Sequence, residues 1–205
     1  IEAGEVVGLL GPNGAGKTTT MRMLTTFLPP SSGTAQVAGF GITEEAEQVR
    51  RAIGYLPETP PLYPEMRVSE YLRFVAAIKG VGKKRVCAAV EEVLALCGLE
   101  DSAAKLCGTL SKGYRQRVGL SASLVHRPPV LILDEPTSGL DPAQILEIRE
   151  LISSLRGKHT VVLSTHILPE VQETCSRVLI ISNGKIAVEG SVEQLTKEHS
   201  LEEEF

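Results

Sequence analysis

The segment Gly11-Pro12-Asn13-Gly14-Ala15-Gly16-Lys17-Thr18 decides the fold, because it fits the pattern G-x-x-x-x-G-K-[ST]. It follows Glu5-Val6-Val7-Gly8-Leu9-Leu10, an apolar run typical of a buried strand, and precedes a predicted helix from Thr19 to Phe27. Glycines between a strand and a helix let main-chain N–H groups surround phosphate oxygens. We expect the Lys17 ammonium to reach the terminal phosphates and the Thr18 hydroxyl to bind magnesium. The predicted nucleotide-binding residues are Gly11, Pro12, Asn13, Gly14, Ala15, Gly16, Lys17, Thr18 and Thr19.

Three later apolar runs resemble the first. They are Val130-Leu131-Ile132-Leu133, Thr160-Val161-Val162-Leu163 and Val178-Leu179-Ile180-Ile181, and none of them alternates with polar residues. Continuous apolar strands are typical of parallel sheets covered by helices on both faces. A helix is predicted from Pro142 to Leu155, with Asp141 as its N-cap and proline at its first position. We therefore expect an α/β fold with a mostly parallel sheet flanked by helices.

The middle of the chain has a different pattern. No strand is predicted from Val68 to about Gly108, and a tract with four prolines, Pro57 to Pro64, leads into this region. An apolar stripe at helical spacing, ending before Gly98, consists of Val86, Val90, Val93, Leu94 and Cys97. These features predict an inserted α-helical subdomain. Near the end of the chain, Asn183-Gly184 predicts a C-terminal β-hairpin.

Two carboxylates and a histidine follow predicted strands. Asp134 and Glu135 come directly after Leu133, and His166 comes after Ser164-Thr165. Ligands gather outside the carboxyl ends of parallel strands, so these side chains should face the phosphates. Asp134 could hold magnesium while Glu135 accepts a proton from water, as phosphoryl transfer to water requires. We expect His166 to hydrogen-bond the γ-phosphate or the water.

The segment Leu110-Ser111-Lys112-Gly113-Tyr114-Arg115-Gln116 begins another helix, which is predicted to run to about Val125. A serine hydroxyl and free N–H groups at a helix start make a second possible phosphate site. Helix capping alone would also account for these residues. By itself, the segment leaves both interpretations open.

Composition excludes several classes of protein. The 205 residues carry 25 acidic and 21 basic side chains, so there is no electrostatic footprint for nucleic acid. The four cysteines lack zinc-site spacing and are expected to be reduced thiols in a cytosolic protein. No apolar run reaches the ~18 to 20 residues that cross a bilayer. The end Glu202-Glu203-Glu204-Phe205 is expected to be a solvated tail.

Taken in order, these motifs resemble the nucleotide-binding domain of ABC transporters over nearly the whole chain. The resemblance is carried by residues 11–18, 110–116, 130–135, Ser138-Gly139-Leu140-Asp141 and His166. It implies a P-loop NTPase core that hydrolyses ATP with Mg²⁺ and couples dimer closure to transport by a membrane partner, with export expected. It also implies a single domain in which 1–60 and 109–205 form the ATPase core and 61–108 form the helical subdomain.

The resemblance assigns further roles by position. Glu135 would be the catalytic base, His166 the switch histidine and Asp141 a link across the dimer. The magnesium ligands would be Thr18, Glu58 and Asp134. The signature segment that meets the ATP of a second ABC ATPase domain in a homodimer would be Ser111, Lys112, Gly113 and Tyr114. The implied partners are ATP, that second domain and an integral membrane permease subunit, without nucleic acid. The implied location is cytoplasmic, peripheral at the inner face of the cell membrane.

The sequence departs from the family pattern at several positions. Glu58 stands where the family usually has glutamine; a carboxylate can still bind magnesium, but it adds negative charge beside the triphosphate. Lys112 and Tyr114 replace the commonest glycine and glutamine of the signature. The segments around Glu58 and Ser111 are similar to those of bacterial exporter ATPases of multidrug and gliding-motility types. The domain is expected to be N-terminally incomplete, with its adenine-stacking residue upstream of Ile1.

Other functions stay open at this point. A soluble ABC-type ATPase acting on ribosomes or DNA would need a second ATPase cassette, a basic linker or long coiled-coil arms, and none of these is visible between the motifs. A GTPase or small-molecule kinase is disfavoured because there is no N-K-x-D motif. A membrane partner is expected to dock near Tyr63, Met66, Tyr71 and Phe74 if these side chains are exposed; otherwise they belong to the core of the helical subdomain.

Overall fold

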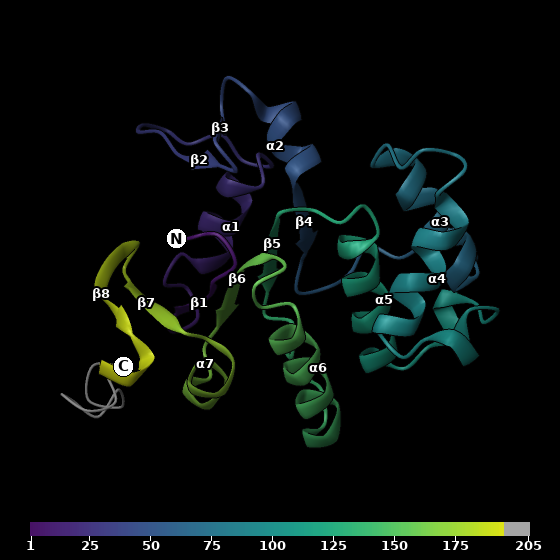
Figure 1. Cartoon of the computed structure of the whole chain (residues 1–205). Helices are drawn as coiled ribbons and strands as arrows, with labels where there is room; N and C mark the ends of the chain where they lie inside the picture. Colours follow the sequence, from purple (N-terminus) through teal and green to yellow (C-terminus); the bar gives the residue numbers. More distant parts are fainter. Residues whose placement is uncertain (195–205) are drawn as a thin grey trace.

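A six-stranded sheet forms the centre of the computed structural model, which describes residues 1–194 (Figure 1). Its strand order is β4-β5-β6-β1-β7-β8, in which neighbouring strands from β4 to β7 are parallel and β8 is antiparallel to β7. The bounds are β1 Val6–Leu10, β4 Ile53–Leu56, β5 Val130–Asp134, β6 Thr160–Thr165, β7 Arg177–Ser182 and β8 Lys185–Ser191. Strands β2 (Gln36–Val37) and β3 (Phe40–Gly41) form a separate hairpin. The expected mostly parallel sheet and C-terminal hairpin are confirmed.

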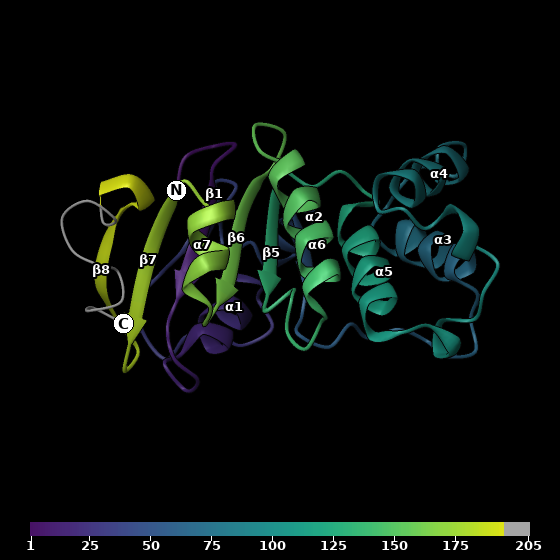
Figure 2. The same ribbon diagram turned by 90° about the horizontal axis from the view of Figure 1, so that it is seen from below.

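Helices cover both faces of this sheet. Helices α1 (Lys17–Leu24) and α2 (Ala46–Ala52) lie on one face, and α6 (Pro142–Ser154) and α7 (Leu168–Thr174) lie on the other (Figures 1 and 2). Neighbouring residues of one strand therefore enter different cores. Leu131 and Leu133 belong to the larger core, whereas Ile132 packs in the smaller core with Met21 of α1. This two-sided burial explains the continuous apolar runs.

The helical part of the chain lies at one end of the molecule (Figure 1). It contains α3 (Val68–Ile78), α4 (Val86–Leu96), two short 3₁₀ turns (Glu100–Ser102 and Cys107–Thr109) and α5 (Lys112–Leu124). Helices α3, α4 and α5 contact one another, and α5 also packs on β4. The predicted stripe of α4 is buried at Val90, Val93 and Leu94. The helical insertion is thus attached to the edge of the sheet through α5 and β4.

Two local predictions need correction. No strand was predicted at Ile53-Gly54-Tyr55-Leu56, but this segment forms β4 and pairs with β5. The helix expected from Thr19 to Phe27 spans Lys17–Leu24 instead, and Phe27 is largely exposed. Its earlier start makes Lys17 the first residue of α1, directly after the phosphate loop.

Three further sequence expectations have different outcomes. Cys97, Cys107 and Cys175 are buried free thiols, but Cys87 is exposed. Burial raises the pKa of Cys97 to about 11 and that of Cys175 to about 12.

None of the helices in residues 1–194 has the length and apolarity that a bilayer crossing requires. The predicted acidic tail at Glu202–Phe205 lies outside the described residues.

Candidate nucleotide site

The phosphate loop joins β1 to α1 and depends on its glycines. A Cβ at Gly11 would lie 2.4 Å from the carbonyl oxygen of Ile181, so no larger residue fits there. Gly16 has φ 107°, a left-handed conformation that only glycine adopts without strain. These glycines let the chain turn sharply from β1, so the N-terminus of α1 points at the loop. A helix N-terminus of this kind favours an anion.

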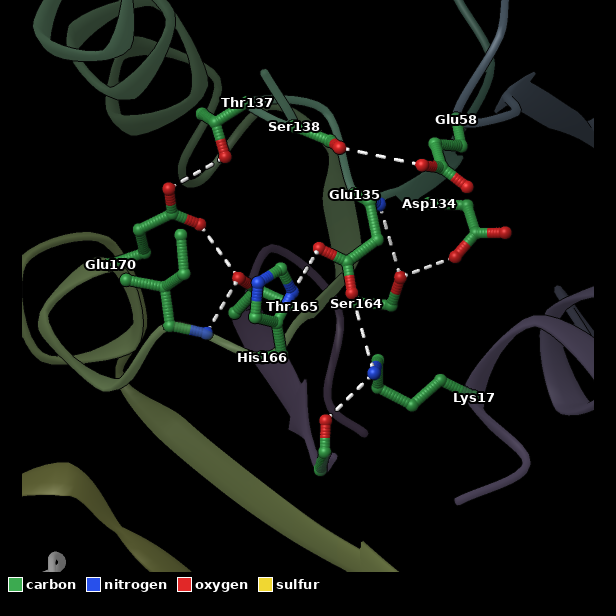
Figure 3. Close-up of polar contacts among 12 residues, drawn as sticks. Lys17, Glu58, Asp134, Glu135, Thr137, Ser138, Ser164, Thr165, His166 and Glu170 are labelled. Carbon is green, nitrogen blue, oxygen red and sulfur yellow. Dashed lines mark hydrogen bonds and ion pairs between the residues drawn. The ribbon is translucent and has the colours of Figure 1, made fainter. Parts of the chain in front are cut away.

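Lys17 is held beneath this loop. Its Nζ donates to the carbonyl oxygens of Gly11 at 2.7 Å and Pro12 at 3.2 Å, and it lies 3.3 Å from Glu135 Oε1. Lys17 is almost fully buried, so its positive charge is concentrated inside the loop. Figure 3 shows its ammonium group beneath the Glu135 carboxylate. A bound phosphate would compete with Glu135 for this ammonium.

Asp134 ends β5 beside the start of α1. Its Oδ1 accepts two hydrogen bonds, from Ser164 Oγ at 2.5 Å and from Thr18 Oγ1 at 3.4 Å. Asp134 is 1% exposed, so its charge depends on these hydroxyl donors. The resulting pair of a carboxylate and a threonine hydroxyl consists of hard oxygen donors, which Mg²⁺ prefers.

Glu135 and His166 face each other across the ends of β5 and β6. His166 Nδ1 lies 2.9 Å from Glu135 Oε2 (Figure 3). Glu135 has φ 49°, an uncommon conformation for this residue, and its N–H donates to both the carbonyl oxygen and Oγ of Ser164 at 3.1 Å. Ser164 therefore fixes both acids: the Asp134 side chain and the Glu135 main chain.

Glu58 approaches the same site from the loop after β4. Its Oε1 accepts from Ser138 Oγ at 3.3 Å, and its main-chain oxygen accepts from Gln116 Nε2 at 2.9 Å. A cavity of about 270 Å³ lies between these parts. It is lined by Asn13, Gly14, Gly16, Lys17, Thr18, Thr19, Glu58, Glu135, Ser138 and His166. The structure thus brings together the phosphate loop, Glu58, the acids after β5 and His166.

The signature segment and Asp141 do not line this cavity. They stand at the starts of α5 and α6, where Ser111 Oγ accepts from Tyr114 N at 3.4 Å and Asp141 Oδ1 accepts from Gln144 N at 3.0 Å. The two helix starts pack closely, since a Cβ at Gly113 would lie 2.4 Å from Gln144 Oε1. The capping roles expected for Ser111 and Asp141 are therefore present.

The predicted docking residues have unequal exposure. Tyr63 and Phe74 are exposed, and their ring centroids lie 5.7 Å apart in an edge-to-face pair. Tyr71 is buried, and burial raises its pKa to about 12. Met66 is half-buried and packs against the larger core. Of the four predicted docking residues, Tyr63 and Phe74 therefore offer exposed aromatic surface to a partner.

Sequence reasoning missed several polar residues around this site. Ser138 and Ser164 contact Glu58, Asp134 and Glu135 directly. Strand alignment could have indicated Ser164. Ser164 lies four residues after Thr160 and Asp134 lies four residues after Val130, and Asp134 and Ser164 are paired in the sheet. Behind them, Glu170 connects Thr137 and Thr165. No sequence spacing indicated that connection.

A buried parallel strand, a glycine-rich loop, a helix N-terminus and acids at the end of a nearby strand define an α/β P-loop NTPase. The family model for the ABC transporter matches residues 1–138, and a model described as "AAA domain, putative AbiEii toxin, Type IV TA system" matches residues 108–171. The chain belongs to the ABC transporter family and is one of its ATP-binding domains.

Individual relatives agree with this membership. The chain is 40% identical over 198 residues to the uncharacterized ABC transporter ATP-binding protein YxlF of Bacillus subtilis, covering 97% of this chain and 65% of that protein. It is 40% identical over 207 residues to the bacitracin transport ATP-binding protein BcrA of Bacillus licheniformis. This match covers 100% of this chain and 67% of that protein. The chain thus spans about two thirds of the length of these relatives.

Solved structures give the same fold. A dimeric ATP-binding cassette in a post-hydrolysis state, bound to ADP and Pi, matches with a TM-score of 0.85 and 26% identity. The match covers 94% of this chain and 87% of that one. The α/β P-loop NTPase fold of ABC ATPase domains is therefore confirmed.

Proposed function

We propose that this chain is the ATP-binding and hydrolysing part of an ABC transporter. The observation that carries the proposal is one cavity at the carboxyl ends of parallel strands. It is lined by Lys17, Glu135 and His166, and Asp134 contacts Thr18 of the same lining. This is where an α/β sheet binds its ligand. The family membership and the relatives named as transport ATP-binding proteins support transport as the purpose of the hydrolysis.

The triphosphate would occupy the phosphate loop. Its terminal oxygens would take the place of Glu135 beside the Lys17 ammonium, because the two anions compete for one cation. Glu135, released from that ion pair, would accept a proton from the attacking water. His166, now 2.9 Å from Glu135, would donate to the γ-phosphate or orient the water. These steps supply the positioning and proton acceptance on which phosphoryl transfer depends.

The donor set at this site fits Mg²⁺. Thr18 Oγ1 and Asp134 Oδ1 lie 3.4 Å apart, and Glu58 lines the same cavity. Residues 1–194 contain no group of three or more histidine, cysteine or acidic side chains that could hold a metal unaided. Mg²⁺ usually binds through one or two carboxylates together with substrate phosphates and water. When bound, it would neutralise charge on the phosphates.

The expected assembly is a head-to-tail homodimer beneath a membrane permease. Ser111, Lys112 and Tyr114 are exposed and lie outside the cavity lining, so the segment with Gly113 would meet the ATP of a second copy, with Asp141 nearby. The dimeric solved cassette supports this arrangement. Exposed Tyr63 and Phe74 would contact the permease. We further propose the division into 61–108 as helical subdomain and the rest as ATPase core, located in the cytoplasm at the inner face of the cell membrane, with export as the direction.

Glu135→Gln in the full-length protein tests this function. We expect ATP turnover to fall at least about a hundredfold, because the amide cannot accept the proton of water, while ATP stays bound and the dimer stays closed. Steady-state phosphate release and size-exclusion chromatography with ATP measure the two effects. The exposed acid Glu150 of α6 provides a control, and Glu150→Gln should keep full turnover. Unchanged hydrolysis by Glu135→Gln would remove the proposed base.

Lys17→Ala separates binding from chemistry. Without the ammonium held at the loop carbonyls, ATP affinity itself should fall, as measured by fluorescence titration or calorimetry.

The proteins that copurify with the full-length protein distinguish a transporter from the soluble alternative. Recovery of the full-length protein with an integral membrane protein would support the transporter, and recovery with ribosomes or DNA would overturn it.

A further inference from the structure

Glu170 of α7 is a buried carboxylate that the reaction scheme does not use. It is 1% exposed, and both of its oxygens are occupied. Oε1 accepts from Thr137 Oγ1 at 2.6 Å, and Oε2 accepts from Thr165 Oγ1 at 2.7 Å. One side chain on α7 therefore connects the segment after β5 to the end of β6.

Both threonines are neighbours of residues that face the cavity. Thr137 lies two residues after Glu135, and Thr165 lies directly before His166. Thr165 Oγ1 also accepts from Ile167 N at 3.1 Å, so the same hydroxyl fixes the chain on the far side of His166. Figure 3 shows Thr165 and His166 between Glu170, at the left of the view, and Lys17, at the right. Glu170 does not line the cavity, so its effect on the site would pass through Thr137 and Thr165 and the main chain that carries them.

The segment held in this way is under backbone strain. Glu135 has φ 49°, and such a conformation persists where the surrounding contacts determine it. Ser164 holds the N–H of Glu135 from one side, and Thr137, bound to Glu170, holds the chain just beyond it. The distance of 2.9 Å between Glu135 and His166 thus depends on two segments that meet at Glu170.

The buried charge of Glu170 is compensated locally. Arg149 of α6 lies 3.9 Å from Oε1, and its other nitrogen donates to the exposed Glu173 at 2.7 Å. The two threonine hydroxyls give the shorter contacts. Glutamine at position 170 would have the same volume as glutamate, but only one oxygen that can accept hydrogen bonds. Its amide nitrogen can only donate, so the threonine on that side would have to turn its hydroxyl from donor to acceptor, which alters that contact without opening a cavity.

We propose that Glu170 is a positioning residue for ATP hydrolysis, which sets the relative placement of Glu135 and His166 through Thr137 and Thr165. This inference rests on the proposed function, because it assigns Glu170 a part in that same reaction. A residue that only stabilised the fold would affect stability and ATP binding together. A positioning residue lowers turnover while ATP affinity is kept.

The test compares Glu170→Gln with Glu173→Gln in the full-length protein. Both changes replace a carboxylate that faces Arg149 by an amide on the same helix, but only Glu170 contacts the threonines. We expect Glu170→Gln to lower kcat about tenfold or more, because a misplacement of about 1 Å can cost about a hundredfold. ATP affinity should stay within about twofold of the unchanged protein. Glu173→Gln should keep both.

A second readout follows His166 itself. The chain has four histidines, so the ring signal of His166 can be assigned in an NMR spectrum by its loss in His166→Ala. Glu170→Gln should shift and broaden this signal, whereas Glu173→Gln should leave it unchanged. Thr137→Val removes one of the two contacts without touching Glu170, and it should lower kcat in the same direction even if Glu170→Gln fails to fold.

The failures of the two proposals are distinguishable. Absence of ATP hydrolysis in the unchanged protein would contradict the proposed function. Normal hydrolysis in that protein together with an unchanged kcat in Glu170→Gln or in Thr137→Val would overturn only the positioning role. Equal losses of turnover and ATP affinity would also overturn it, because they would indicate a structural residue.

Discussion

Glu58 brings a third carboxylate to a site that already contains Asp134 and Glu135. It lines the cavity and accepts from Ser138 Oγ at 3.3 Å, so its carboxylate is held near the phosphate loop. Lys17 and His166 are the basic side chains of the same lining. A third carboxylate adds a fully charged oxygen ligand beside the phosphate loop, so it strengthens the attraction of the site for Mg²⁺.

Glu58→Gln is therefore expected to retain hydrolysis while raising the Mg²⁺ concentration needed for half-maximal activity several-fold. An amide oxygen can replace the carboxylate as a ligand and as the acceptor for Ser138, but it attracts Mg²⁺ less strongly. Phosphate release measured across a magnesium series checks this. The exposed Glu65 of the following loop is the control, and Glu65→Gln should keep the original magnesium dependence. Complete loss of hydrolysis in Glu58→Gln would show that the carboxylate is essential.

Elements with a strong periodic or continuous pattern could be predicted from the sequence, and short ones could not. Strands β1, β5, β6 and β7 are continuous apolar runs because helices cover both of their faces. Strand β4 was missed because it has only four residues, including Gly54, and leads directly into the proline-rich tract that begins at Pro57. Helices α2 and α7 have seven residues each, too few for two turns of a clear apolar stripe.

Gly54 of β4 allows α5 to pack closely on this strand. A Cβ at Gly54 would lie 2.1 Å from the Ser123 carbonyl oxygen and 2.7 Å from Leu131 Cδ2. The Ser123 contact is with main chain, so a side chain cannot rotate away to relieve it. The close approach of α5 to β4 in turn supports the loop that carries Glu58, because Gln116 of α5 donates to the Glu58 carbonyl.

Gly54→Ala should lower the free energy of unfolding by about 1 to 3 kcal/mol, the usual cost of overpacking a core. Urea denaturation measures the loss. Gly82 serves as the control, because a Cβ there would meet nothing within 4 Å. Gly82→Ala should change the stability by less than about 1 kcal/mol. A loss of the same size in both variants would mean that the contact with α5 is not the cause.

At the scale of the whole molecule, the site is assembled from segments that are far apart in the chain. The phosphate loop, the loop after β4 and the ends of β5 and β6 meet because their strands are neighbours or near neighbours in one sheet. Sequence motifs could indicate Lys17, Asp134, Glu135 and His166, since each follows a recognisable strand. They could not indicate the contacts of Glu170 and Ser138, because the partners of these side chains are determined by helix and loop packing.

The fold also half-buries a histidine at the opposite, amino end of the sheet. His126 follows α5, and its Nε2 lies 3.0 Å from the Ile53 carbonyl at the start of β4. Its Nδ1 is buried without a hydrogen-bond partner among residues 1–194. Burial and, secondarily, the charge of Lys79 lower the pKa of His126 to about 4. The adjacent cavity of about 340 Å³ is lined by basic side chains: Arg51, Lys79, Arg85 and Arg127.

This arrangement predicts that acid destabilises the whole fold through His126. An unfolded histidine has a pKa of about 6.5, so between pH 6.5 and 4 the unfolded chain binds a proton that the folded chain excludes. Stability is therefore complete above pH 6.5 and is lost as the pH falls through this window, by about 1 kcal/mol at pH 5 after allowance for solvent screening.

Urea denaturation at pH 7 and pH 5 measures this loss, and His126→Gln should reduce it. Glutamine has no proton to gain in this range, and its amide can still donate to the Ile53 carbonyl. An identical pH dependence in the two proteins would show that other groups cause the acid sensitivity. A smaller pH dependence in His126→Gln would show that the acid sensitivity arises at the contact between α5 and β4. There, a proton on His126 Nδ1 would add a positive charge beside Lys79 and would have no hydrogen-bond acceptor.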